Sequence, residues 1–146
     1  VFKFIDIHPA TQSDLQVGFR DGATNYDATV TSTFFASDHN EADSGATLGY
    51  KTSYDLAQST DFQTLSFNVG TENDECSSGY LHLFNPSSTT YVKHFISVSN
   101  SYHGSDISFN NYVAGYCNTT TAIDGVQFKF ASGNIDDGII KLYGVK

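Results

Sequence analysis

The sequence is poor in several residue types, and each shortage narrows what the chain can do. Its 146 residues include no Met, no Trp, two Cys and two Pro, and only seven Lys and Arg stand against sixteen Asp and Glu, a formal net charge of −9. A charge of this sign repels polyphosphate at long range, so we expect no nucleic-acid partner. No apolar run approaches the roughly 20 residues of a transmembrane helix, so we expect no membrane partner either.

The absence of Met also bears on the start of the chain, because Val1 cannot be the initiator of a conventional translation product. We therefore expect a further segment ahead of Val1, such as a leader, a propeptide or another domain. The size of 15.9 kDa suits one domain, which buries about two-thirds of the surface that its unfolded chain exposes. No repeat, linker or low-complexity block divides residues 1–146, so the sequence predicts a single domain.

The two cysteines, Cys76 and Cys117, are too far apart in the sequence to form a CxxC metal or redox motif. An even pair in an acidic, Gly- and Ser-rich chain favours one disulfide. Two free thiols explain the sequence almost as well, so both alternatives stay open.

Alternation of apolar and polar residues with a period of two is abundant. Leu15, Val17 and Phe19 share one face of residues 14–20, a pattern typical of a half-buried strand. Only residues 53–62 suggest a helix, and we interpret them as a loop with at most one helical turn. Strands are predicted at residues 2–7, 14–20, 28–35, 46–52, 63–69, 80–84, 91–99, 107–116, 124–130 and 139–145.

About ten short strands separated by turn signals indicate an all-β, antiparallel two-sheet β-sandwich, and a jelly-roll-like form fits this length. The last strand, residues 139–145, follows a turn rich in Asn, Asp and Gly and is expected to be buried in the sheet. The predicted core consists of Leu15, Val17, Phe19, Leu65, Phe67, Val69, Val126, Phe128, Phe130 and Leu142.

One acidic loop, residues 36–45, is the best candidate for a metal. Asp38, Asn40 and Asp43 offer oxygen ligands near a glycine, as in a calcium loop, but no Glu stands at the twelfth position of an EF-hand. This makes a weak calcium-loop candidate, and a solvated acidic loop is the competing interpretation.

Histidine and tyrosine give weaker indications of a site. His82 and His94 become cross-strand neighbours if residues 80–84 pair with residues 91–95, and such a pair is more often structural than metal-binding. Several tyrosines stand among polar residues and suit the binding of sugars or proteins, although the polar face of any sandwich explains them too. These tyrosines are Tyr26, Tyr50, Tyr54, Tyr102 and Tyr112.

Catalytic motifs are missing from the sequence. There is no GxSxG elbow and no HExxH zinc motif. We therefore assign no catalytic residue, expect no cofactor, and interpret the chain as a non-enzyme.

Three stretches resemble a group of small virion structural proteins of tailed bacteriophages: the opening "FKFIDIHPATQSDLQVGFR", the middle "GYLHLFNPSSTTYVKHFISVSN" and the close "NTTTAIDGVQFKFASGNIDDGIIKLYGVK". In that group an aromatic strand and a turn lead into a second strand, as at Ser13-Asp14-Leu15 here. A penultimate strand opens as at Ala122-Ile123, and the chain closes on a Gly-rich turn followed by a motif like "LYGVK". The resemblance covers nearly the whole chain. The sequence departs from the group in its two cysteines and in the acidic loop from Asp38 to Asp43.

The resemblance implies a β-sandwich without enzyme activity on the virion surface, and hence an extracellular location. Its expected roles are capsid decoration or a tail-fibre or knob domain used in host attachment. Expected partners are other virion proteins and copies of itself, most simply as a trimer, with a host surface glycan as a further candidate. The alternative is a carbohydrate-binding or adhesin module of a secreted bacterial protein, and a glycan-cleaving domain is a third hypothesis.

Overall fold

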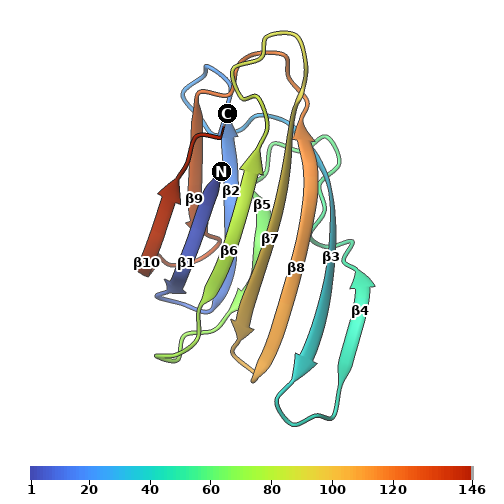
Figure 1. Ribbon diagram of the computed structural model, residues 1–146, viewed down its shortest axis with the longest axis vertical. Coiled ribbons are helices and arrows are strands. Elements are labelled where there is room, and N and C mark those ends of the chain that lie inside the picture. Colours follow the sequence, from blue (N-terminus) through green and yellow to red (C-terminus); the bar gives the residue numbers. More distant parts are fainter. Residues whose placement is uncertain (146) are drawn as a thin grey trace.

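The computed structural model describes residues 1–145, and within them every regular element is a β-strand. Figure 1 shows the strands running roughly along the long axis of the molecule. The ten strands are β1 (Phe2–Pro9), β2 (Ser13–Arg20), β3 (Val30–Asn40), β4 (Ala46–Tyr50), β5 (Gln63–Val69), β6 (Ser77–Leu83), β7 (Lys93–His103), β8 (Ile107–Cys117), β9 (Gly125–Phe130) and β10 (Ile135–Leu142).

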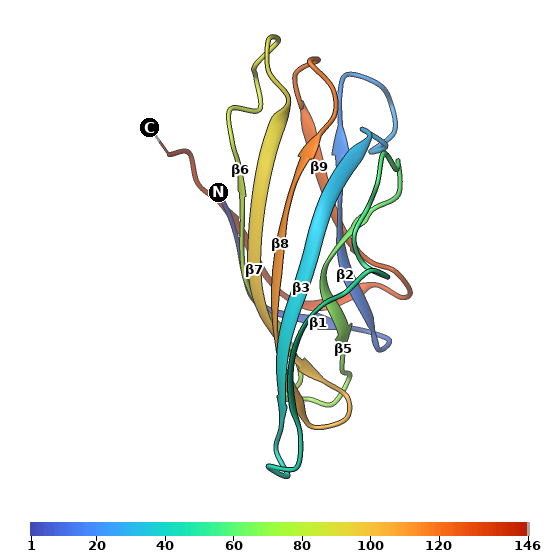
Figure 2. The same cartoon turned by 90° about the vertical axis from the view of Figure 1, so that its right-hand side faces the viewer.

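The strands form two layers of unequal width. The larger sheet has the order β10-β1-β6-β7-β8-β3-β4, and the smaller sheet has the order β5-β2-β9, all with antiparallel neighbours. β5 and β7 join the two sheets through the pair Val69 and His103. Figure 1 shows the smaller sheet lying behind β1, β6 and β7 of the larger one, and Figure 2 shows the two layers facing each other. The fold is therefore an antiparallel β-sandwich in which three strands face seven.

The core fills the space between the layers. Phe19 and Phe95 come from opposite sheets, and their ring centroids are 5.1 Å apart. Leu15, Val17 and Phe19 of β2 are at most 1% exposed, because β2 is the central strand of the smaller sheet. Apolar side chains that point inward from both sheets therefore make one continuous core.

The inner face of the larger sheet is partly polar. Ser66 of β5 lies with its Oγ 2.7 Å from Ser77 Oγ and 2.6 Å from Ser99 Oγ, and all three residues are buried. Asn111 donates from Nδ2 to Ser101 Oγ at 3.2 Å in the same layer. Because a buried polar group costs free energy unless it is hydrogen-bonded, these contacts fix how the two sheets sit on each other.

Most of the sequence expectations for the fold are confirmed. All ten predicted strands exist, residues 53–62 form a loop, and nine of the ten predicted core residues are buried or pack against the core. The tenth, Leu142, is 70% exposed, and every described residue of β10 is exposed. The prediction that the last strand is buried is wrong, because β10 lies at the rim of the larger sheet, where the narrower sheet does not cover it. Lys146, the last residue of the terminal motif, lies outside the described residues.

Candidate binding surface

One row of side chains crosses the outer face of the larger sheet, the face turned away from the core. Consecutive register pairs join Tyr80 of β6 to Val98 of β7, Val98 to Tyr112 of β8, Tyr112 to Phe35 of β3, and Phe35 to Tyr50 of β4. We call these five residues the central row. Because cross-strand partners share one face of a sheet, the central row forms a line of four aromatic rings and one Val over five adjacent strands.

Three of the four aromatic residues of the central row, Tyr80, Phe35 and Tyr50, are exposed although they are large, and Tyr112 is half-buried. Phe35 is 42% exposed and Tyr50 52%, whereas the next residue along β3, Phe34, is 0% exposed. Phe35 and Tyr112 stack with centroids 4.8 Å apart and an interplanar angle of 5°. This stack orients two rings before any partner arrives, which lowers the entropy that binding must overcome.

Aromatic and imidazole rings extend the surface along β6. Tyr80, His82 and Phe84 alternate outward, with centroids 5.0 Å apart for the first pair and 6.1 Å for the second. A shallow hollow of about 420 Å³ lies beside them and is lined by His94, Ile96, Ala114, Tyr116 and neighbouring residues. The small Ala114 leaves room between larger neighbours, so the hollow can receive an apolar group from a partner.

His82 and His94 lie on this outer face, as their predicted hairpin requires, but they are not directly opposite. The register pairs His82 with Ile96, and Phe84 N–H donates to His94 O at 2.9 Å. The two rings are diagonal neighbours, since the hairpin register is shifted by two residues from a direct pair.

The opposite end of the outer face is polar. A hollow of about 410 Å³ is lined by His39, Asn40, Glu41, Asn100, Ser101, Tyr102 and Ser108. A hydrogen bond to the Glu41 carboxylate raises the pKa of Tyr102 well above its ordinary value, so this phenol stays neutral. Neutral phenol, amide and hydroxyl groups beside exposed rings allow the surface to combine apolar contact with hydrogen bonding.

The calcium-loop residues do not converge on one point. Asp38 accepts a hydrogen bond from Thr47, Asn40 Oδ1 accepts from Ser44 N at 2.9 Å, and Asp43 pairs with His39 at 3.1 Å. Asn40 thus caps the turn between β3 and β4. Within residues 1–145, no group of three or more His, Cys, Asp or Glu residues is arranged to hold a metal ion. Each of the three side chains is thus held by a different partner within residues 38–47.

The two cysteines are free thiols. Cys76 immediately precedes β6, whose Ser77 pairs with Ser101 of β7, whereas Cys117 pairs with Lys93 at the other end of β7. Eight residues of strand separate those two positions on β7, about 27 Å at the rise of an antiparallel strand. A disulfide needs α-carbons within roughly 7 Å, so the hypothesis of a bridge within one chain is wrong.

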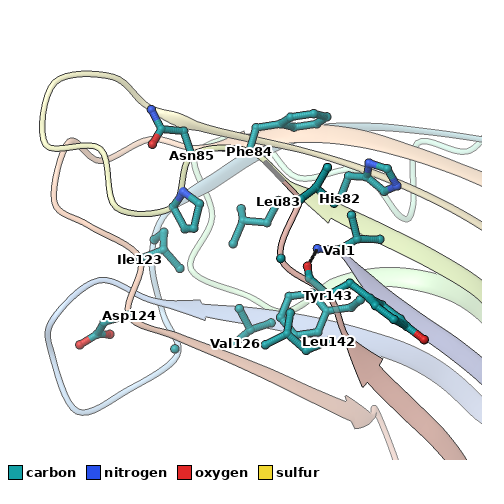
Figure 3. Close-up of a pocket in the computed structure, with 15 residues that line it drawn as sticks. Val1, His82, Leu83, Phe84, Asn85, Ile123, Asp124, Val126, Leu142 and Tyr143 are labelled. Carbon is teal, nitrogen blue, oxygen red and sulfur yellow. Dashed lines mark hydrogen bonds between the residues drawn. The ribbon is translucent and has the colours of Figure 1, made fainter.

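An apolar groove of about 740 Å³ opens between the two layers beside β10. Figure 3 shows Leu83, Ile123, Val126 and Leu142 around it, with Val1 N bonded to Tyr143 O at 2.7 Å. Asp124 also lines the groove, but its carboxylate accepts a hydrogen bond from Arg20 Nε at 2.9 Å, which lowers the pKa of Asp124. The groove is thus an uncovered part of the sandwich with mostly apolar walls.

Part of this surface could be predicted from the sequence. Of the five tyrosines expected to form a binding surface, Tyr50, Tyr102 and Tyr112 lie on the outer face. Tyr54 turns inward and packs against Phe34 and Phe67, and Tyr26 lies beside Arg20, away from the outer face. The stack of Phe35 on Tyr112 could not be predicted, because the sequence alone does not show which strands are neighbours in the sheet. The one available signal was the apolar pair Phe34-Phe35, in which alternation must direct one ring outward.

No helix among the described residues is long and apolar enough to cross a membrane. No protein-family model matches the chain, and neither the curated proteins nor the solved structures give a match.

Proposed function

We propose that the chain is a non-enzymatic structural domain on the surface of a bacteriophage virion, and that it acts by binding through the outer face of its larger sheet. The central row is the observation that carries this proposal. Large exposed apolar side chains gathered on one sheet face are typical of contact surfaces, and aromatic rings dominate the energetics of such contacts.

The sequence supports the virion setting through its resemblance to phage structural proteins at the opening, middle and close of the chain. Two roles follow, which differ in what contacts the outer face. A decoration domain would place it against other capsid proteins, whereas a fibre or knob domain would present it to the host. The net charge of −9 disfavours an acidic partner in either role.

Immunogold electron microscopy tests the virion setting. Antibodies raised against the purified domain should label intact purified phage particles, over the head for a decoration protein and at the tail for a fibre. Quantitative peptide analysis of the same particles should find the chain in a fixed ratio to the major capsid protein. Particles that carry neither label nor peptides contradict the proposal.

The central row also favours a second candidate, a carbohydrate-binding module. Apolar faces of sugar rings stack on exposed aromatic side chains, while the polar hollow near Asn100 and Tyr102 supplies hydrogen-bonding groups. From Tyr80 to Tyr50 the row spans four strand spacings, about 19 Å, which is long enough for an oligosaccharide. A neutral glycan suits the acidic chain better than a sulfated one.

A glycan array with the purified chain tests this candidate. Tyr112→Ala removes one ring of the stack and should reduce binding of any glycan hit at least about tenfold, the typical loss of a strong aromatic contact. Tyr26→Ala is the matched control, because Tyr26 lies beside Arg20, away from the outer face, and should leave binding unchanged. Turnover of the bound glycan would contradict a non-enzymatic role.

A further inference from the structure

The free edge of β10 is regular from Ile139 to Leu142, whereas its register with β1 shifts on both sides of Asp137. β10 pairs with β1 on one side and has no partner on the other within residues 1–145. Natural edge strands are commonly short, or guarded by proline, inward charges or bulges. β4, at the opposite rim, has five residues and follows the acidic hairpin. β10 has eight residues, and Ile139 is 52% and Leu142 70% exposed.

The hydrogen-bonding groups of β10 alternate between its two sides. Tyr143 N–H donates to Val1 O at 2.8 Å, and Tyr143 O accepts from Val1 N at 2.7 Å, so the Tyr143 backbone faces β1. Alternation then turns the backbone of Leu142 and Ile140 toward the free edge. These N–H and C=O groups are available to an added antiparallel strand.

We propose that two copies of the chain associate edge to edge through β10, with the strands antiparallel about a two-fold axis at Ile139. This pairing would extend the larger sheet of one copy into the larger sheet of the other. It does not depend on the virion setting, since a carbohydrate-binding module could dimerise in the same way.

Charge complementarity selects this register. With the axis at Ile139, Asp137 of each copy lies opposite the partner's Lys141, and the two Ile139 residues face each other. An axis at Ile140 would place Lys141 opposite the partner's Ile139 and leave both charges without partners. An axis at Lys141 would place two ammonium groups face to face, which is unfavourable.

The same register fits the hydrogen bonds of the edge. It places Ile140 opposite the partner's Gly138, whose N–H now bonds to the side chain of its own neighbour Asp137 at 2.7 Å. When Asp137 turns to the partner's Lys141, this N–H becomes free to join the ladder. Ile139, whose backbone faces β1, then forms a non-hydrogen-bonded pair with its symmetry mate.

Antiparallel edge pairing uses the same surface on both copies, so it closes after two subunits. The trimer expected from the sequence would need another surface. The interface of this dimer would contain contacts between apolar side chains and two symmetry-related Asp137–Lys141 pairs. Each copy would also cover the exposed strand edge of the other.

Charge reversal tests the pairing in the full chain by sedimentation over a range of concentrations. Lys141→Glu places Glu opposite Asp137 twice and should weaken the dimer by about tenfold, since two attractions become repulsions. The double variant Asp137→Lys with Lys141→Glu restores opposite charges and should recover dimerisation. Lys129→Glu makes the same charge change on the outer face of the smaller sheet and should have no effect. Circular dichroism confirms that each variant is folded.

Disulfide trapping tests the register independently. Cα atoms of a non-hydrogen-bonded antiparallel pair are about 4.5 Å apart, within the range for a disulfide. Ile139→Cys, in a Cys76→Ser background, should therefore cross-link two chains on mild oxidation, whereas Lys141→Cys should not. A chain that stays monomeric at every concentration, a dimer that ignores the charge changes, or a cross-link at residue 141 in place of 139 overturns the proposal. Immunogold labelling is unaffected by these variants, so failure here is distinct from failure of the virion assignment.

Discussion

β2 and β10 carry the same kind of sequence but have opposite environments. Both contain several large apolar residues, yet Leu15 of β2 is 0% exposed and Leu142 of β10 is 70% exposed. β2 lies between β5 and β9 and faces the larger sheet, whereas β10 lies at the rim of that sheet with β1 as its neighbour. Apolar residues that favour extended backbone therefore identify a strand, but the width of the opposite sheet decides which of their side chains become core.

The largest expected effect comes from making the same substitution in both strands. Leu15→Ala should lower the free energy of unfolding by about 2–5 kcal/mol, because it removes a fully buried side chain and leaves a cavity. Leu142→Ala should change it by no more than about 0.5 kcal/mol, because the side chain is mostly exposed. Urea denaturation at a concentration where the chain is monomeric measures both. Equal losses would show that β10 is covered and that the comparison is wrong.

The strands and turns could be predicted from the sequence because they depend on local alternation and on turn residues such as those at residues 132–138. The order of the strands in the two sheets could not be predicted, because β1 pairs with β6 and β3 pairs with β8 although many residues separate the partners in the sequence. The central row depends on that order and on its register. For the same reason the sequence does not show that Tyr112 lies on the outer face of the larger sheet whereas Tyr54 packs against the core.

A smaller effect is expected from the polar layer inside the sandwich. Ser66→Ala removes a hydroxyl that bonds to two buried serines, Ser77 and Ser99, and should lower the free energy of unfolding by about 1–3 kcal/mol. Ser87→Ala is the matched control, since Ser87 is exposed in the loop after β6, and its effect should be near zero. Chemical denaturation compares the two variants. If the Ser66→Ala variant had the same free energy of unfolding as the parent, this result would contradict a structural role for the buried serines.

The smallest expected effect is a pH dependence of stability that comes from His103, a partly buried residue of β7. Burial lowers the pKa of His103 from 6.5, with a weaker opposing effect from Glu75. The unfolded chain therefore binds this proton more readily, so stability should fall as the pH decreases through 6.5. Burial raises the pKa of Asp14 from 3.8, and its effect, of opposite sign, belongs to a more acidic range.

Melting temperatures between pH 7.5 and pH 5.5, a range of about one unit on each side of 6.5, report this dependence. His103→Gln should flatten the profile in that range. A profile that keeps its slope in His103→Gln would assign the dependence to another group.

Chemical cross-linking of purified particles tests the proposed binding surface most directly, because lysines mark the two outer faces of the sandwich. Lys3 is the register partner of Tyr80 at the end of the central row, whereas Lys129 projects from the smaller sheet over Phe62. With an amine-reactive reagent and mass spectrometry, we expect Lys3 of a decoration domain to be linked to a different virion protein, and Lys3 of a fibre domain to be linked only after host receptor is added. In both cases Lys129 should remain unlinked. Links to other virion proteins through Lys129 alone, or particles without this chain, would contradict a virion domain that binds through its larger sheet.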